Sequence, residues 1–336
     1  MNDDTAALQA GLDALLPRLL PRARRVAGLQ RLSAGATLQT WSFDALGDDA
    51  FIHPLILRRS PGGRRGNQTL SLPLEAALVQ ALAGSGVPVA EVLHTLQPAD
   101  ALGDGFIMTR IPGETLARKI QRDAAYAGAR AVLVQQLGTA AGALHSQPLA
   151  GLPTLPVRST AVTLASLQHR CQALPQPDAV FEWALCWLRR QLPVEPAALH
   201  LVHGDFRLGN VIVGSEGLRA VLDWEIAHLG DPAEDLAWLC LPPWRFGQIT
   251  QPVAGLGTRD ELFAAWQAAT GERVDPTRVR WWQAAGSLRW GLLCAGMRDW
   301  FESGADPTVE RAMIARRVSE NQIDLLRLLD SEDACA

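Results

Sequence analysis

The 336-residue sequence predicts an α+β fold of two lobes, a small antiparallel sheet followed by a larger, mainly helical part. Two observations predict it. Short apolar segments separated by turn-rich residues dominate the chain up to residue 111, and helical spacing dominates from residue 112 onward. We find no internal repeat and no low-complexity linker, so we expect residues 1–111 and 112–336 to meet at a short hinge near Ile111.

The first lobe is expected to hold one sheet and one further helix behind an N-terminal helix. Leucines at helical spacing predict the N-terminal helix over residues 5–20. A second helix, which carries Glu75, is expected over 72–82. Five strand-like segments complete this lobe as an antiparallel sheet, at residues 28–32, 39–43, 55–59, 92–96 and 105–110.

The second lobe is expected to be helical except for one hairpin. The hairpin joins apolar segments 211–213 and 220–222 through a Gly-Ser-Glu-Gly turn at 214–217. Helical spacing predicts helices at residues 124–146, 161–174, 179–191, 232–241, 259–270, 275–302 and 306–330.

Composition excludes several classes of function. The chain is 48% hydrophobic and 20% charged with a net charge of −4, which is typical of a globular protein without a nucleic-acid partner. Its five cysteines are odd in number and lack any Cys-x-x-Cys pair, which argues against a disulfide framework or a zinc site. We see no signal-peptide order and no run of membrane-spanning length. We therefore expect a cytoplasmic protein with no membrane partner.

The most informative segment is Leu201-Val-His-Gly-Asp-Phe-Arg-Leu-Gly-Asn210, followed by Asp223-Trp-Glu225. A His-x-Asp-x-x-x-x-Asn pattern with a later Asp places one carboxylate beside an attacking hydroxyl and supplies oxygen ligands for a metal. We therefore interpret Asp205 as the general base of phosphoryl transfer, and Asn210 with Asp223 as ligands of Mg²⁺. The alternative for Asp205 is a simple turn cap.

These residues resemble the aminoglycoside phosphotransferase family, relatives of choline and fructosamine kinases that share the protein-kinase-like fold. The variant His-Gly-Asp-Phe-Arg-Leu-Gly-Asn, with Asp-Trp-Glu and then Leu229-Gly-Asp-Pro-Ala-Glu-Asp-Leu236, is especially similar to kinase-like domains associated with acyl-CoA dehydrogenases. The resemblance spans about residues 28–240. It implies ATP and Mg²⁺ as cofactors and a small-molecule hydroxyl acceptor, with a link to acyl-CoA metabolism.

Residues around the proposed base have competing interpretations. His203 is expected to hold the loop, although it could also act as a base or a metal ligand. Arg207 either steers phosphate or pairs with an acidic neighbour, and Glu225 joins the metal site or serves as a solvated or capping residue. Asp231 is expected to cap a helix. For Asp235 the resemblance implies a bond back to the catalytic loop.

In the first lobe, the small residues of segment 32–41 occupy the place of a phosphate-covering loop, to which Ser33 or Thr37 could add a hydroxyl. Lys119 is the only lysine, against thirty arginines, and it lies beyond the hinge. Arg58, paired with Glu75, is therefore the expected substitute for the phosphate-binding lysine. The register leaves Arg59 as an alternative. The remaining interpretation is that Arg58 is an exposed residue at a strand end with no role in phosphate binding.

The strand at 105–110 would pass the adenine edge. Met108 and Arg110 are its candidate cofactor-binding residues, although Met108 could equally be plain core. Tryptophans at near-helical spacing concentrate in the last third of the chain, where they either form core or line an apolar acceptor pocket.

The expected function is ATP- and Mg²⁺-dependent phosphorylation of a small-molecule hydroxyl, with a hydroxyacyl thioester or hydroxy acid as the preferred acceptor. Two alternatives stay open: an aminoglycoside phosphotransferase, and a nucleotide-binding module without turnover. A Walker A motif and an Ala-Pro-Glu segment are both absent from the sequence, which disfavours a P-loop kinase and a protein kinase.

Overall fold

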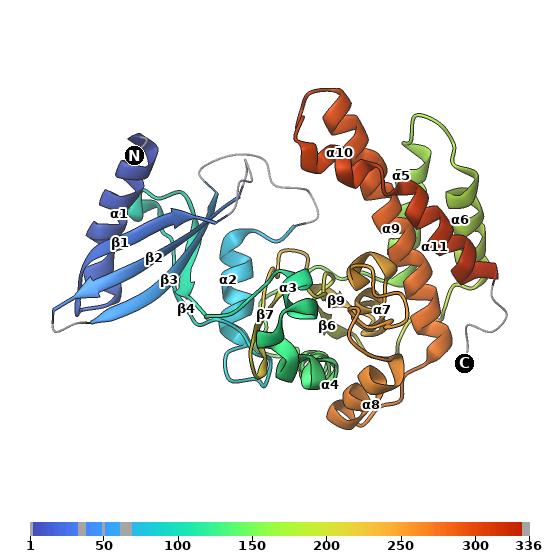
Figure 1. Ribbon diagram of the computed structural model, residues 1–336, viewed down its shortest axis with the longest axis horizontal. Coiled ribbons are helices and arrows are strands. Elements are labelled where there is room, and N and C mark those ends of the chain that lie inside the picture. The colour runs from blue at the N-terminus through green and yellow to red at the C-terminus, as the bar shows by residue number, and fades with distance from the viewer. Residues whose placement is uncertain (1–2, 33–37, 49–50, 61–68, 331–336) are drawn as a thin grey trace.

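The computed structural model describes residues 3–32, 38–48, 51–60 and 69–330 (Figure 1). Its first part is a five-stranded antiparallel sheet in the order β1-β2-β3-β5-β4, which confirms the predicted sheet. The strands are β1 (Ala23–Arg31), β2 (Gln39–Gly47), β3 (Ile52–Ser60), β4 (Val92–Thr95) and β5 (Asp104–Thr109).

Helix α1 (Asp3–Leu19) packs on one face of this sheet, because its leucines recur at helical spacing and meet the alternate apolar residues of β2 and β3. The buried cluster between them includes Leu8, Leu12, Leu16, Trp41, Phe43, Leu55 and Leu57. Helix α2 (Leu72–Ala81) contacts β4 and β5, and it begins where the Ser71 hydroxyl accepts the Leu74 backbone N–H.

The second part is mainly helical, as predicted, and it gathers on the other side of the molecule in Figure 1. Its helices are α3 (Ala117–Arg122), α4 (Ala127–His145), α5 (Thr160–Gln172), α6 (Ala179–Arg190), α7 (Ala233–Leu239), α8 (Arg259–Thr270), α9 (Pro276–Glu302), α10 (Val309–Ala315) and α11 (Val318–Asp330). The short 3-10 turns are η1 (Pro98–Asp100), η2 (Ala124–Tyr126) and η3 (Pro242–Arg245).

One helix prediction was wrong. The single helix expected over 306–330 is two helices, α10 and α11, because the chain closes a tighter turn in which the Arg317 N–H donates to the Ile314 carbonyl at 2.9 Å. No Gly or Pro marks this break in the sequence. Both helices pack against α9.

Four short strands position the catalytic segment. β6 (His200–Val202) pairs with β9 (His228–Gly230), and the predicted hairpin is present as β7 (Val211–Gly214) and β8 (Gly217–Val221). A bridge between Glu114 and Val213 ties this hairpin to the chain just after the expected hinge. The segment between β6 and β7 is thereby held at both ends by backbone pairing. The division at residues 111 and 112 stays a prediction.

No helix in the described ranges is long and apolar enough to cross a membrane. The cysteines that the structure describes, Cys171, Cys186, Cys240 and Cys294, are all free thiols.

Candidate active site

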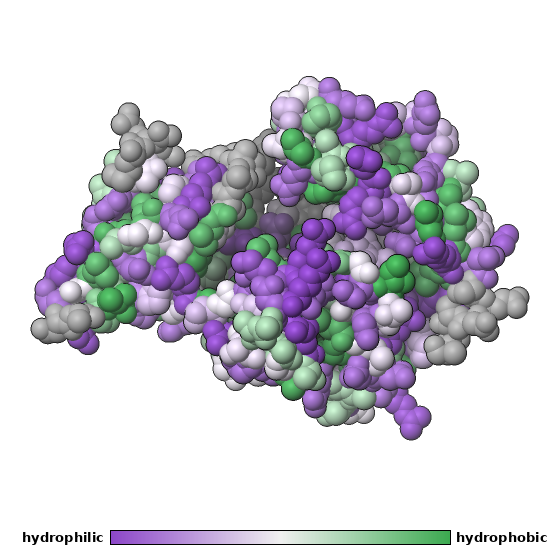
Figure 2. Space-filling view, viewed as in Figure 1, coloured by the Kyte–Doolittle hydropathy of each residue, from purple (hydrophilic) through white to green (hydrophobic). Residues whose placement is uncertain are grey.

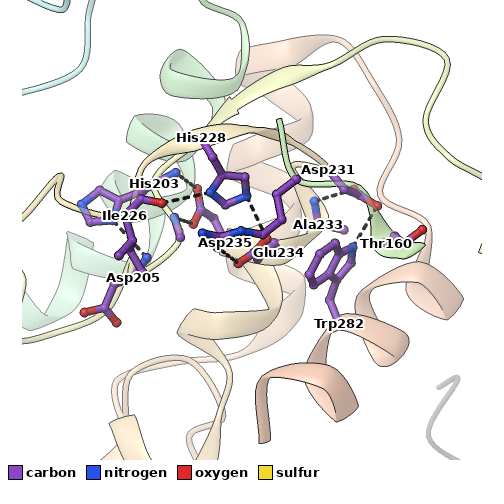
Figure 3. Close-up of polar contacts among 12 residues, drawn as sticks. Thr160, His203, Asp205, Ile226, His228, Asp231, Ala233, Glu234, Asp235 and Trp282 are labelled. Atoms are coloured by element: carbon purple, nitrogen blue, oxygen red, sulfur yellow. Dashed lines mark hydrogen bonds and ion pairs between the residues drawn. The ribbon is translucent and has the colours of Figure 1, made fainter. Parts of the chain in front are cut away.

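Asp235, which is fully buried near the start of α7, fixes the backbone of the catalytic segment. Its carboxylate accepts the N–H groups of His203 at 2.8 Å and Gly204 at 2.9 Å, and Figure 3 shows Asp235 beside His203. It also contacts His145 Nε2 at 3.1 Å. Burial alone raises the pKa of Asp235, but the His145 contact and the nearby His203 outweigh it and hold the pKa below its usual range. An ionised carboxylate therefore anchors the turn at Gly204, whose φ of 81° suits glycine.

His203 is buried and points its ring into the loop itself. Its Nε2 lies 2.8 Å from the Leu222 carbonyl, and its Nδ1 accepts the Asp205 N–H at 3.2 Å. The ring also packs against Trp224 with centroids 4.6 Å apart. One ring nitrogen thus contacts the loop backbone and the other contacts the backbone after β8, which favours the expected holding role over a base or a metal ligand.

Asp205 presents its carboxylate away from the Asp235 network, as Figure 3 shows. Three donors orient it: Trp238 Nε1 at 2.6 Å from Oδ1, Arg207 Nε at 3.0 Å from Oδ1, and Asn210 Nδ2 at 2.6 Å from Oδ2. Arg207 therefore pairs with an acidic neighbour, one of the two roles considered for it. A carboxylate held from both oxygens has a defined direction in which to accept a proton.

Asn210 and Asp223 flank the two strands of the β7–β8 hairpin, so both lie at the same end of it. The Leu222 N–H donates to the Asn210 carbonyl at 2.8 Å, and Val211 pairs with Val221. Asp223 has a left-handed backbone with φ of 65°, which Asp tolerates better than most residues. Its side chain keeps 34% of its surface exposed beside the catalytic loop.

Arg58 reaches this cluster from strand β3. Its guanidinium lies 3.3 Å from Glu75 Oε1, 2.6 Å from Asp223 Oδ1 and 3.7 Å from Glu225 Oε2. Burial alone lowers the pKa of Arg58, but these three carboxylates together outweigh it and raise the pKa above its usual value. Burial also acts against the charge on Asp223, and Arg58 outweighs it, so the pKa of Asp223 is lowered.

Arg59 points to the opposite face of the sheet, because successive strand residues alternate. Its Nε donates to Gln39 Oε1 at 3.0 Å and its Nη1 to the Leu102 carbonyl at 3.3 Å, on the side covered by α1. Of the two arginines considered, Arg58 is thus the one placed beside Glu75 and the catalytic segment. Lys119 pairs with Glu114 on the helical part, away from the sheet.

For the remaining candidates of the first lobe, the structure gives no direct contact with the catalytic segment among the described residues. Arg110 lies on the Arg58 face of the sheet, but it is engaged by Ser42 at 2.5 Å and Asp44 at 2.6 Å. Met108 pairs with Ile56 on the same face and is partly buried against the core. Ser33 and Thr37 lie outside the described residues.

Two further predictions concern the acids after the hairpin. Asp231 Oδ1 accepts the Ala233 N–H at 3.0 Å, as expected of a cap. Its Oδ2 accepts hydrogen bonds from Arg278 Nη1 and Trp282 Nε1. Glu225 Oε2 lies 3.7 Å from Arg58 Nη2, so a solvated role alone does not describe it. Figure 2 shows the surface hollowed between the sheet and the helical part.

Sequence reasoning missed Trp238 and Arg289. The Trp238 indole donates to Asp205, and the Arg289 guanidinium lies 3.8 Å over the Trp238 ring while its Nη2 donates to the Gly204 carbonyl at 2.8 Å. Neither residue belongs to a recognisable motif. The only available signal for Trp238 was its position one turn beyond Asp235 on a predicted helix, which is also what a core residue shows.

The residues present fit a divalent cation. Within the described part of the chain, Glu75, Asp223 and Glu225 all contact the Arg58 guanidinium, and they offer carboxylate oxygens, the ligands that Mg²⁺ prefers. Among the described residues, no group of three or more His, Cys, Asp or Glu side chains forms a complete cage. A site with few protein ligands suits Mg²⁺ that keeps waters and phosphate oxygens.

A family model described as "Phosphotransferase enzyme family" matches residues 28–282. Among curated proteins, acyl-CoA dehydrogenase family member 11 of Mus musculus is 27% identical over 303 residues, covering 83% of this chain. Member 10 of the same species is 30% identical over 199 residues, covering 56%. The matched regions are 37% and 18% of those relatives' own lengths.

Solved structures show the same fold. A choline/ethanolamine kinase family protein of Mesorhizobium loti has a TM-score of 0.64 at 20% identity, covering 97% of this chain and 96% of its own. Aminoglycoside phosphotransferase APH(4)-Ia, solved with AMP-PNP and hygromycin B, also has a TM-score of 0.64, at 17% identity over 96% of this chain and 99% of its own. These likenesses confirm the protein-kinase-like fold and leave the acceptor open.

Proposed function

Because the chain belongs to the phosphotransferase enzyme family, we propose that it transfers the γ-phosphoryl group of ATP to a hydroxyl of a small-molecule acceptor. The observation that carries this proposal is the convergence of Asp205, Asn210 and Asp223 at one end of the β7–β8 hairpin, opposite Arg58 on the sheet. Phosphoryl transfer needs the phosphates' charge neutralised and a hydroxyl held in line, and these groups supply both.

Each residue has a distinct proposed part. Asp205 accepts the hydrogen bond of the acceptor hydroxyl and takes its proton as the new oxygen–phosphorus bond forms and the bond from the γ-phosphorus to the bridging oxygen breaks, which releases ADP. Asn210 and Asp223 would hold Mg²⁺, and the ion would neutralise charge on the β- and γ-phosphates. Arg58, positioned by Glu75, binds the α- and β-phosphates in place of a lysine. His203, Arg207 and Asp235 hold the loop, and Met108 is the proposed contact of the adenine base.

The acceptor is proposed from the curated relatives. Their names place related sequence within acyl-CoA dehydrogenase family proteins, and this favours a hydroxyacyl thioester or a hydroxy acid. The likeness to APH(4)-Ia supports an aminoglycoside as the second candidate. A cytoplasmic location stays a prediction.

An acceptor panel tests the proposal. The chain is incubated with ATP, Mg²⁺ and a hydroxyacyl thioester, a hydroxy acid, an amino sugar, choline or a sugar, and the phosphorylated acceptor is measured by mass spectrometry. Asp205→Asn keeps the shape and removes the charge, so transfer should fall about 10²–10⁴-fold while nucleotide binding persists. Asp260→Asn, the same change at an exposed position on α8, is the matched control.

Near-normal transfer by Asp205→Asn would contradict the assigned base. Nucleotide binding without transfer to any acceptor in the wild-type protein would favour a binding module without turnover.

A further inference from the structure

A cavity of about 1250 Å³ lies in the helical part, between α3, the η3 turn and helices α9, α10 and α11. Such a volume accommodates a small molecule. Its most unusual feature is its charge, because six arginines line it: Arg118, Arg245, Arg259, Arg316, Arg317 and Arg327.

Few carboxylates balance these arginines. Among the described residues that line the cavity, the acids are Glu320 and Asp324. Glu320 forms an ion pair with Arg317, with 2.9 Å between Oε2 and Nε. The lining thus carries a clear excess of positive charge in a chain whose net charge is −4. A concave surface concentrates that potential and attracts anions.

Arg245 and Arg259 are less exposed than Arg118, Arg316 and Arg327, which lie at the rim of the cavity. The Nε atoms of both are buried and meet no hydrogen-bond acceptor in the part of the chain that the structure describes. Arg245 Nη2 donates to the Cys240 carbonyl at 2.7 Å, which fixes the guanidinium in the wall. Burial lowers the pKa of Arg245, and the adjacent Arg259 charge lowers it as well. An anion bound here would relieve the repulsion between them.

Residues in the wall of this cavity contact the tryptophans beside the proposed base. Leu241 and Phe246, which line it, pack with Trp238 and Trp244 in one apolar cluster. The Trp238 indole donates to Asp205, and Trp244 lies 4.6 Å from the Arg207 guanidinium that pairs with Asp205. Trp238 and Trp244 therefore connect residues of the cavity wall with Asp205 and with the Arg207 that pairs with it.

We infer that this cavity binds an anionic group, carboxylate or phosphate, carried by the acceptor at a distance from its reacting hydroxyl. The inference rests on the proposed function, and it narrows the acceptor to a hydroxyl compound that is also an anion. Acceptors rich in ammonium groups are disfavoured, because they would meet arginines on several sides.

Calorimetric titration of the whole chain, without nucleotide or metal, tests the inference with four probes. Inorganic phosphate and succinate separate the two anion chemistries, while glycerol and choline are the neutral and cationic controls. Phosphate, succinate or both should bind, and Arg245→Gln should weaken that binding about 10-fold, the effect of one lost charge-assisted hydrogen bond. Because Arg245 also holds the Cys240 carbonyl, the exposed rim variant Arg327→Gln provides a second test that spares the fold, with a fall of about 3-fold.

Arg298→Gln is the matched control, because this exposed arginine of α9 pairs with Glu302 and does not line the cavity. Equal anion affinity in wild type and both cavity variants would overturn the inference, as would tighter binding of choline than of either anion. An affinity that falls only in Arg58→Ala would place the anion on the nucleotide side and would also overturn it. Anion binding in the cavity of a protein that phosphorylates none of the panel acceptors would instead refute the proposed function.

Discussion

Two clusters of charge in this molecule have opposite balances. Among the residues that the structure describes, three carboxylates contact the Arg58 guanidinium, whereas six arginines and two carboxylates line the cavity beside α9, α10 and α11. Trp238 and Asp205 lie between the two. The first cluster is suited to a cation and the second to an anion, although the same residue types build both. What a site binds is therefore set by the local ratio of charges, which neither composition nor net charge reveals.

The largest expected effect comes from removing a carboxylate of the Arg58 cluster. Asp223→Asn should reduce Mg²⁺-dependent ATP turnover to the limit of detection, because the amide cannot supply an anionic oxygen to the metal. Turnover is followed as ADP release across a Mg²⁺ titration. Wild-type rates in this variant would exclude Asp223 as a ligand.

Asp223→Ala makes the same test with a built-in complication. The backbone at this position has φ of 65°, and Ala is strained there by about 1 kcal/mol whereas Asn adapts. We therefore expect Asp223→Ala to unfold at a lower temperature than Asp223→Asn by circular dichroism, with equal loss of turnover. Equal melting temperatures would show that the strain is relieved elsewhere.

Arg58 provides the next largest effect. Arg58→Ala should weaken AMP-PNP binding about 10–100-fold by calorimetry, since a charged hydrogen-bonding group contributes about 1.5–3 kcal/mol, and Arg58→Lys should retain part of the affinity. Arg59→Ala is the matched control one residue away. It should leave nucleotide affinity unchanged while lowering stability, because Arg59 is buried against Gln39. The reverse outcome would move the phosphate contact to Arg59.

This pair also shows where sequence reasoning ends. Alternation predicts that Arg58 and Arg59 face opposite sides of a strand, but only the pairing of β3 with β2 and β5 decides which side faces the catalytic segment. Arg110 lies on the same face as Arg58, yet its guanidinium is engaged by Ser42 and Asp44. That contact joins residues far apart in the chain, and no local pattern encodes it.

The motif residues were predictable because their spacing is itself local. His203, Asp205, Asn210 and Asp223 sit on one loop and one hairpin, so short-range geometry nearly determines their arrangement. The cavity was not predictable in this way. Its arginines come from five separate elements, and the break between α10 and α11 that shapes one wall has no Gly or Pro to announce it.

The smallest expected effect concerns Asp324, a carboxylate that offsets part of the positive charge of the cavity lining. Burial is the main cause that raises its pKa to about 6, and Glu320 raises it too, while Arg245, Arg317 and Arg327 act in the opposite direction. A raised pKa means that Asp324 takes up its proton at a higher pH in the folded protein than an exposed aspartate does. As pH falls from 8 to 5, Asp324 should therefore lose its negative charge, and the cavity should become more positive.

Sulfate is the probe that isolates this change, because it remains a dianion throughout that range. Its affinity, measured by calorimetry, should rise about 3-fold between pH 8 and pH 5, the size expected for one partly screened charge. Asp324→Asn should bind sulfate at pH 8 as tightly as the wild type does at pH 5, with little pH dependence of its own. If the pH dependence survives in Asp324→Asn, a different group titrates, and Asp324 does not set the charge that an anion meets in the cavity.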